Sequence, residues 1–170
     1  MSAQRNACAI TAAPTRAASS TRLAVPQIMP VLVKHLMTSP VVSLFAEQTL
    51  PLAEDIMQFR HIRHLPVIDE DGRLLGIVSH RDLLRAQLSS LTDLSEERRR
   101  ALQENVRVRQ LMTREVCTVT PDTLASTAGK TLVEHRFGCL PVVDEQDVVV
   151  GIVTERDFLR FATKAIELHD

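Results

Sequence analysis

Three apolar stretches of strand length and two segments with apolar residues at helical spacing follow one another between residues 41 and 88. The predicted strands are 41–44, 65–69 and 74–79, and the predicted helices are 52–59 and 80–88. The last two strands flank Asp71 and Gly72, and Asp-Gly favours a tight turn between antiparallel strands. This part of the chain therefore predicts the order β-α-β-β-α.

The same order of elements recurs in the second half of the chain. The corresponding stretches are 116–119, 124–134, 140–144, 148–154 and 155–166. The turn of the second hairpin, 145–147, contains no glycine, so we expect a looser connection there than in the first hairpin. Gly129 and Thr131 lower the intrinsic helix propensity of the helix in which they lie.

Short motifs recur at a constant distance of 75 positions. The pairs are Leu-Met-Thr at 36–38 and 111–113, Leu-Pro-Val at 65–67 and 140–142, Gly-Ile-Val at 76–78 and 151–153, and Arg-Asp at 81–82 and 156–157. No gap is needed to align 33–85 with 108–160. Matches that stay in register over this length indicate an internal duplication.

A β-α-β-β-α unit of this size cannot bury both faces of a three-stranded sheet, whereas two units packed sheet to sheet can. The predicted fold is therefore α/β (α+β), with two repeats at 31–88 and 108–166, a pseudo-twofold axis and two equivalent clefts. Residues 89–107 predict a connecting helical segment, because acids follow Ser95 and arginines come later. Residues 1–30 lack periodicity and predict a disordered tail, with a targeting segment as the second interpretation.

The composition narrows the classes of partner. Hydrophobic residues make up 45% of the 170 residues, charged residues make up 24%, and the formal net charge is −1. A near-neutral chain without Trp or Tyr has neither a basic surface for nucleic acid nor the aromatic platforms on which single-stranded bases stack. No apolar run approaches the roughly 18 residues of a membrane helix. We therefore expect no nucleic-acid partner and no membrane insertion.

The cysteines follow no regular pattern. They are Cys8, Cys117 and Cys139, and an odd number at irregular spacing is not a disulfide framework. We therefore expect reduced thiols and a cytoplasmic protein.

The same strand-to-helix junction closes both repeats. It comprises Ser79, His80, Arg81 and Asp82 in the first repeat and Thr154, Glu155, Arg156 and Asp157 in the second. A helix N-terminus, a hydroxyl and a guanidinium together favour phosphate, and the aspartate can accept hydrogen bonds from ribose hydroxyls. However, a hydroxyl residue three positions before an aspartate is also the spacing of a capping box, so the pattern alone leaves both interpretations open.

In combination, the motifs resemble the CBS domain family, here as a tandem pair. The resemblance rests on Leu-Met-Thr, Leu-Pro-Val-x-Asp and Gly-Ile-Val-[Ser/Thr]-x-x-Asp, and it covers residues 31–162. It implies a regulatory, non-enzymatic module that binds AMP, ADP, ATP or S-adenosylmethionine in clefts between the repeats. It also implies a homodimer and an unknown effector protein, with no required cofactor.

The resemblance further implies roles for individual residues. Asp82 and Asp157 would bind ribose, and Ser79 and Thr154 would lie near the phosphate. The other contacts carried over from the family pattern are His80, Arg81, Arg156, Arg63, His64 and Thr120.

The two clefts are predicted to differ. The second repeat has Glu155 at the position of His80, and Gly138 and Cys139 at the positions of Arg63 and His64. We therefore predict that the Asp82 cleft prefers a phosphorylated ligand and that the Asp157 cleft accepts less phosphate or a neutral adenosyl group.

Other functions find less support in the sequence. A protein-interaction scaffold with unoccupied clefts remains the alternative to a sensor. An enzyme would need a nucleophile paired with a general base, and the chain shows no such signature and no P-loop. The spacings His61-x-x-His64 and His135-x-x-x-Cys139 suit a metal but lack further nearby ligands, so we expect no metal site.

Overall fold

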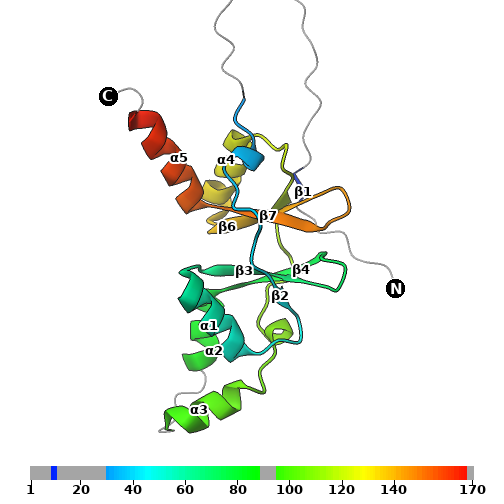
Figure 1. Cartoon of the computed structure of the whole chain (residues 1–170), viewed down its shortest axis with the longest axis vertical. Coiled ribbons are helices and arrows are strands. Elements are labelled where there is room, and N and C mark those ends of the chain that lie inside the picture. The colour runs from blue at the N-terminus through cyan, green and yellow to red at the C-terminus, as the bar shows by residue number, and fades with distance from the viewer. Residues whose placement is uncertain (1–8, 11–29, 89–94, 168–170) are drawn as a thin grey trace, which may run out of the picture.

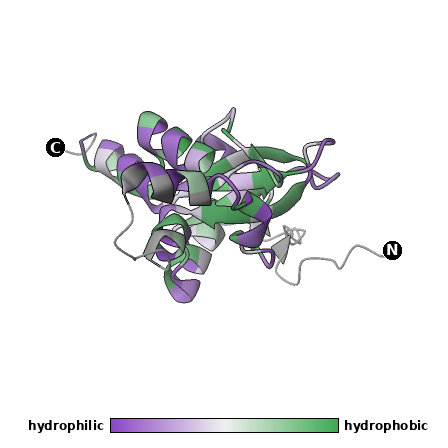
Figure 2. Cartoon of the chain, turned by 90° about the horizontal axis from the view of Figure 1, so that it is seen from below, coloured by the Kyte–Doolittle hydropathy of each residue, from purple (hydrophilic) through white to green (hydrophobic). Residues whose placement is uncertain are grey.

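The structure, a computed structural model, describes residues 9–10, 30–88 and 95–167. These residues form two units whose β-sheets face each other, and the helices lie on the outer side of each sheet (Figure 1). Hydrophobic residues gather in the strands (Figure 2). The predicted α/β fold of two β-α-β-β-α repeats packed sheet to sheet is confirmed.

The first repeat contains a three-stranded sheet in the order β2-β3-β4. Its elements are β2 Leu44–Phe45, α1 Leu50–Arg60, β3 His64–Ile68, β4 Leu74–Ser79 and α2 His80–Leu88. β2 runs parallel to β3, and β3 runs antiparallel to β4 with His64 opposite Ser79. The first strand begins later than the predicted 41–44, because only Leu44 and Phe45 pair with β3.

The second repeat follows the same plan with one added strand. Its elements are β5 Thr118–Val119, α4 Ala125–His135, β6 Cys139–Val143, β7 Val149–Thr154 and α5 Glu155–Glu167. Cys139 lies opposite Thr154, as His64 lies opposite Ser79. The added strand is β1 Ala9–Ile10, which pairs parallel with β5 inside the region predicted as a tail. Residues 1–8 and 11–29 of that region lie outside the described residues.

The segment between the repeats contains the predicted helix, α3 Glu96–Gln103. Arg100 of α3 forms an ion pair with Asp55 of α1, with 3.2 Å between nitrogen and oxygen. Both side chains are exposed, so this pair contributes little to stability. Residues 89–94 lie outside the described part of the chain.

The segment at the start of each repeat packs on the other repeat. The short helix η1 Val33–His35 lies on the second unit, where Val33 is fully buried and its N–H donates to the Thr123 carbonyl at 2.9 Å. The matching helix η2 Val108–Gln110 buries Val108 in the first unit. Figure 1 shows the first of these segments beside α4 before the chain crosses to β2. Each unit has its own hydrophobic core, and each core includes a valine from the start of the other repeat.

Each exchanged segment also extends the sheet that it reaches. Thr38 forms an antiparallel bridge with Ile152 of β7, and Thr113 forms the matching bridge with Ile77 of β4. A Cβ atom on Gly76 would lie 2.6 Å from the Thr113 carbonyl oxygen, and one on Gly151 would lie 2.8 Å from the Met37 sulfur. The glycines of the repeated Gly-Ile-Val motif therefore permit this close crossing.

The two hairpin turns have the same hydrogen-bond pattern, so the expected looser connection at 145–147 is wrong. The N–H of Gly72 donates to the Asp69 carbonyl, and the N–H of Asp147 donates to the Asp144 carbonyl, both at 3.1 Å. Asp147 takes the left-handed conformation, with φ 63°, that Gly72 takes with φ 80°. Aspartate tolerates this conformation better than most residues, and for this reason the second turn forms without glycine.

Two remaining expectations concern the cysteines and the membrane. Cys139 is free and buried, but Cys117 is disulfide-bonded, so the expectation of reduced thiols is wrong for Cys117. The cytoplasmic location stays a prediction. Within 9–10, 30–88 and 95–167, no helix has the length and apolar character needed to span a bilayer.

Candidate functional site

Both repeated aspartates cap the helix that follows the last strand. The Asp82 Oδ2 atom accepts hydrogen bonds from the Ser79 N–H at 2.9 Å and from the Ser79 hydroxyl at 2.5 Å. The Asp157 Oδ2 atom accepts the same two bonds from Thr154, at 2.9 and 2.7 Å. The repeated hydroxyl-x-x-Asp motif therefore caps the helix in both repeats, as the capping interpretation predicted.

The caps use only one oxygen of each carboxylate. Among the described residues, no hydrogen bond reaches Oδ1 of Asp82 or of Asp157. No buried side-chain oxygen in this part of the chain lacks a partner, so both Oδ1 atoms have contact with solvent even though Asp157 is only 7% exposed. An outward-facing carboxylate oxygen held rigid by its capping partner can accept hydrogen bonds from a ligand's hydroxyls.

Basic side chains surround the first junction. Arg63, His80 and Arg81 are exposed, and the His80 N–H donates to the Arg63 carbonyl at 2.8 Å, which joins the start of β3 to the start of α2. None of the three side chains forms an ion pair within the described residues. The guanidinium groups of Arg63 and Arg81 are therefore available to an anionic ligand, together with the N-terminal N–H groups of α2.

The second junction carries a different charge. Arg156 is exposed, but Glu155 occupies the position that His80 has in the first repeat. Gly138 and Cys139 stand where the first repeat has Arg63 and His64, so the start of β6 contributes no positive charge. The two junctions share their strand register and differ in charge.

His64 reaches from the first repeat to the second. A Cβ atom on Gly138 would lie 2.8 Å from both Cε1 and Nε2 of the His64 ring. Burial lowers the pKa of His64 below its usual value. The negative charges of Asp82 and Glu155 favour the protonated ring and oppose this decrease in part. The ring therefore lies at the boundary between the repeats, near the first junction and near the acid of the second.

Cys139 differs from its counterpart His64 in burial and in chemistry. Its side chain is 8% exposed, and burial raises the pKa of the thiol to about 12. A thiol in this state is neutral near pH 7 and is not a nucleophile.

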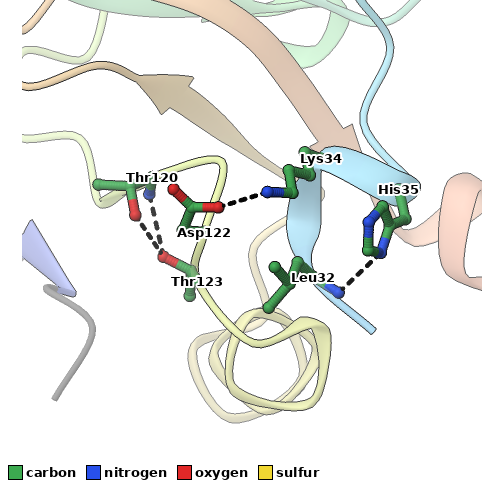
Figure 3. Close-up of polar contacts among 6 residues, drawn as sticks. All are labelled: Leu32, Lys34, His35, Thr120, Asp122 and Thr123. Atoms are coloured by element: carbon green, nitrogen blue, oxygen red, sulfur yellow. Dashed lines mark hydrogen bonds and ion pairs between the residues drawn. The ribbon is translucent and has the colours of Figure 1, made fainter. Parts of the chain in front are cut away.

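Thr120 is not brought together with the second junction. It follows β5 at the end where Val119 pairs with Val142, whereas Thr154 pairs with Cys139 at the other end of β6. The Thr120 hydroxyl and N–H both bond to the Thr123 side chain at 3.0 Å (Figure 3). Thr120 therefore shapes the turn before α4, and this position gives no support to a ligand contact.

Figure 3 also shows how the exchanged segment is held next to this turn. Lys34 pairs with Asp122 at 2.7 Å, and the ring of His35 accepts a hydrogen bond from the Leu32 N–H. Both side chains of the ion pair are exposed. The Thr-Pro-Asp-Thr turn thus anchors the segment that crosses from the first repeat.

Sequence reasoning missed that the exchanged segments run beside the strands that end in the candidate residues. Thr113 pairs with Ile77, two residues before Ser79, and Thr38 pairs with Ile152, two residues before Thr154. Each junction is therefore bordered by backbone from the other repeat. The repeated Leu-Met-Thr motif was the available signal, but it does not reveal which sheet it joins.

Two surface hollows lie away from both aspartates. A hollow of about 410 Å³ lies along α5 and includes Arg156 and Leu159, and another of about 510 Å³ lies beside α1 and includes Ile56 and Phe59. Both are on the outer, helical faces. No group of three or more metal-ligating side chains occurs among the described residues.

The comparisons with known proteins agree with this architecture. Residues 33–89 and 108–164 each match the family model of the CBS domain. A CBS domain-containing protein of Dictyostelium discoideum is 33% identical over 140 residues, which cover 82% of this chain and 96% of that protein. The chain spans only a quarter of some curated relatives: homoserine O-acetyltransferase of Methanococcus vannielii is 26% identical over 132 residues, 78% of this chain and 25% of that protein.

Solved structures with the same fold include ligand complexes. The CBS domain pair of protein MJ0100, in complex with 5′-methylthioadenosine and S-adenosyl-L-methionine, is 27% identical with a TM-score of 0.67, covering 81% of this chain and 99% of that chain. CBSX2 of Arabidopsis thaliana, in complex with AMP, is 27% identical with a TM-score of 0.66, covering 79% of this chain and 97% of that chain. The duplicated fold, the repeated motifs and these matches together show that the chain belongs to the CBS domain family, as a tandem pair.

Proposed function

We propose that this CBS pair is a regulatory module that binds adenine nucleotides or another adenosyl ligand, such as S-adenosylmethionine, at the junctions of Asp82 and Asp157. The observation that carries the proposal is the solvent-facing Oδ1 atom that both aspartates keep while Oδ2 caps the helix. This oxygen can accept hydrogen bonds from a ligand while the cap stays in place. Related CBS pairs solved with AMP, and with 5′-methylthioadenosine and S-adenosyl-L-methionine, support the ligand class.

The proposed binding mode follows from the chemistry of each group. The ribose hydroxyls donate to Oδ1 of the aspartate, and phosphate oxygens accept from the helix N-terminus and from Arg81 or Arg156. The base has no Trp or Tyr on which to stack, because the chain contains neither. It would therefore lie among aliphatic side chains between the two sheets.

The charges around the two junctions support the predicted difference in ligand preference. Arg63, His80 and Arg81 favour a phosphorylated ligand near Asp82. Glu155 opposes a phosphate near Asp157, so that this site would accept a less phosphorylated or neutral adenosyl group.

The exposed helical faces support the proposed homodimer. Large apolar side chains lie on the outer faces of both repeats, with Phe59 81%, Val133 77% and Leu159 69% exposed. Apolar side chains of this size, on helices of both repeats, are typical of a surface that a second copy covers. A Leu159→Glu variant is expected to shift the chain from dimer to monomer in sedimentation velocity, and an unchanged sedimentation coefficient would contradict this mode of assembly.

The alternative function is a protein-interaction scaffold with unoccupied sites. The specific observation that favours it is the set of large apolar side chains exposed on the helices of both repeats, among them Phe59, Val133 and Leu159. In the sensor, an effector protein would recognise the ligand-bound pair, whereas a scaffold would bind its partner without a ligand.

Thermal shift with AMP, ADP, ATP and S-adenosylmethionine separates the two functions. A ligand that binds only the folded state raises the free energy of unfolding, by about 2.7 kcal/mol at a ligand concentration of one hundred times its Kd. The melting temperature therefore rises with the ligand concentration. A dose-dependent rise with at least one of the four ligands supports the sensor. No rise with any of them at millimolar concentration supports the scaffold.

A further inference from the structure

The His64 ring occupies a place that only a glycine in the other repeat allows. Its Cε1 and Nε2 atoms lie where a side chain at position 138 would begin, 2.8 Å from the Cβ position. Gly138 does not have a positive φ, so its backbone conformation does not require glycine. The close approach of the imidazole is the feature that glycine permits at this position.

Charged groups of both repeats act electrostatically on this ring. They are Asp82 and Arg81 of α2, Arg63 just before β3, and Glu155 at the start of α5. The two acids favour the protonated imidazole, whereas the two arginines and the partial burial of the ring disfavour it, and burial has the largest effect. No side chain among the described residues forms a hydrogen bond with the His64 ring.

We infer that His64 is a specificity-determining residue of the Asp82 junction, which takes up a proton when a phosphorylated adenosyl ligand binds and thereby selects that ligand over neutral adenosine. This inference rests on the proposed function, because it requires an adenosyl ligand at Asp82. It goes beyond that function by stating that protonation of the His64 side chain distinguishes a phosphorylated ligand from a neutral one.

The electrostatic reason lies in the balance of charges around the ring. A phosphate group bound at the N-terminus of α2 adds negative charge on the side where Arg81 now disfavours the imidazolium. The same phosphate attracts Arg81 and Arg63, so that their repulsion of the imidazolium is partly neutralised. Both changes favour protonation of His64, and by linkage protonation of His64 favours the phosphate.

Neutral adenosine lacks this effect. Its ribose hydroxyls reach Oδ1 of Asp82 without adding charge, so the protonation of His64 is not favoured. The position of His64 is occupied in the second repeat by Cys139, which is buried and neutral and therefore does not take up a proton. The proton-linked preference is therefore confined to the Asp82 junction.

Titration calorimetry of AMP and of adenosine into the full chain at pH 6.5, in two buffers that differ in ionisation enthalpy, measures the protons taken up. Wild type is expected to take up a few tenths of a proton more per AMP than His64→Gln does. The phosphate of AMP has its own pKa near 6, and its contribution is common to both proteins. The His61→Asn variant, which removes an exposed imidazole at the end of α1, serves as the matched control and is expected to behave as wild type.

The possible failures of the inference and of the proposed function are distinguishable. Binding of AMP with the same proton uptake in wild type and His64→Gln would overturn the role of His64 and leave the proposed function in place. Absence of any binding heat with AMP and adenosine would overturn both. If His64→Gln does not fold, NMR titration of the wild-type His64 ring replaces it. AMP is expected to raise the midpoint of this titration and adenosine to leave it unchanged, and an equal midpoint with both ligands contradicts the inference.

Discussion

The two repeats have nearly the same backbone but different side chains at the junction where a ligand would bind. β3 begins with His64 opposite Ser79, and β6 begins with Cys139 opposite Thr154, in the same register. One position holds an imidazole that crosses to the other repeat, and the other holds a buried neutral thiol. The shared strand register gives His64 and Cys139 equivalent positions, so the junctions differ in charge only through the residue type at each position.

The repeats also reach the same backbone by different means. The left-handed position of the turn is occupied by Gly72 in the first repeat and by Asp147 in the second. Both turns hydrogen-bond to each other across the sheets, since the Leu74 N–H donates to the Asp147 carbonyl and the Val149 N–H donates to the Gly72 carbonyl. The comparison therefore separates features needed for the fold, which are equal in both repeats, from features of the site, which differ.

The largest expected difference concerns the two glycines at the crossing of the exchanged segments. Gly76→Ala is expected to lower the free energy of unfolding by about 2–3 kcal/mol, because its Cβ atom would lie 2.6 Å from the backbone carbonyl of Thr113. Gly151→Ala is expected to lower it by about 1 kcal/mol, because its nearest contact is the movable sulfur of Met37 at 2.8 Å. Urea unfolding of both variants measures the difference. Equal losses would show that the two crossings are not packed as described.

A second comparison replaces the two aspartates in turn. Asp82→Ala is expected to weaken AMP binding at least about tenfold, which corresponds to about 1.4 kcal/mol, and Asp157→Ala is expected to weaken it less. Both variants also lose a helix cap, at about 1 kcal/mol of stability each, so equal losses of stability serve as the internal control. Titration calorimetry with AMP and ATP gives the affinities. Equal weakening by both variants would contradict the predicted difference between the clefts.

The turns offer a smaller test. Asp147→Gly is expected to raise the free energy of unfolding by about 0.5 kcal/mol, because glycine adopts a φ of 63° without the strain of a Cβ atom. Gly72→Ala is expected to lower it by about 1 kcal/mol for the same reason. Thermal unfolding of both variants measures the changes. A stabilising Gly72→Ala would contradict the equivalence of the two turns.

The smallest expected difference is the pH dependence that His64 contributes to stability. Its pKa is lower in the folded protein than the usual 6.5, so the unfolded chain binds the proton more readily. The stability is therefore complete well above pH 6.5 and decreases as the pH falls through 6.5 toward the folded-state pKa. Urea unfolding at pH 7.5 and 5.5 is expected to show a smaller decrease for His64→Gln than for wild type. If the free energy of unfolding of His64→Gln decreases more than that of wild type, burial does not lower the pKa of His64.

Much of the fold was accessible from the sequence because the duplication shows each element twice. Residues 80–88 coincide with α2, and 74–79 coincide with β4. The first strand of each repeat was predicted too long, because only its last residues pair with the neighbouring strand. The second turn was predicted too loose, because the tolerance of aspartate for a positive φ was not considered.

The candidate site was predictable in its residues but not in its geometry. The spacing of Ser79 and Asp82 indicated a cap or a ligand contact, and only the structure shows that one oxygen serves the cap and the other remains accessible. Thr120 was included by resemblance; it follows β5 at the end where Val119 pairs with Val142, and its role as a ligand contact stays a prediction. The contact between His64 and Gly138 joins positions far apart in the chain, and the local pattern contains no signal for it.

A crystal structure of the full chain grown with AMP shows directly whether Asp82 binds the ribose. We expect density for the nucleotide at the Asp82 junction, with the ribose hydroxyls within hydrogen-bonding distance of Oδ1 while Oδ2 keeps its bonds to Ser79. Density for AMP only on the outer helical faces, or none at a saturating concentration, would show that Asp82 is not the binding residue.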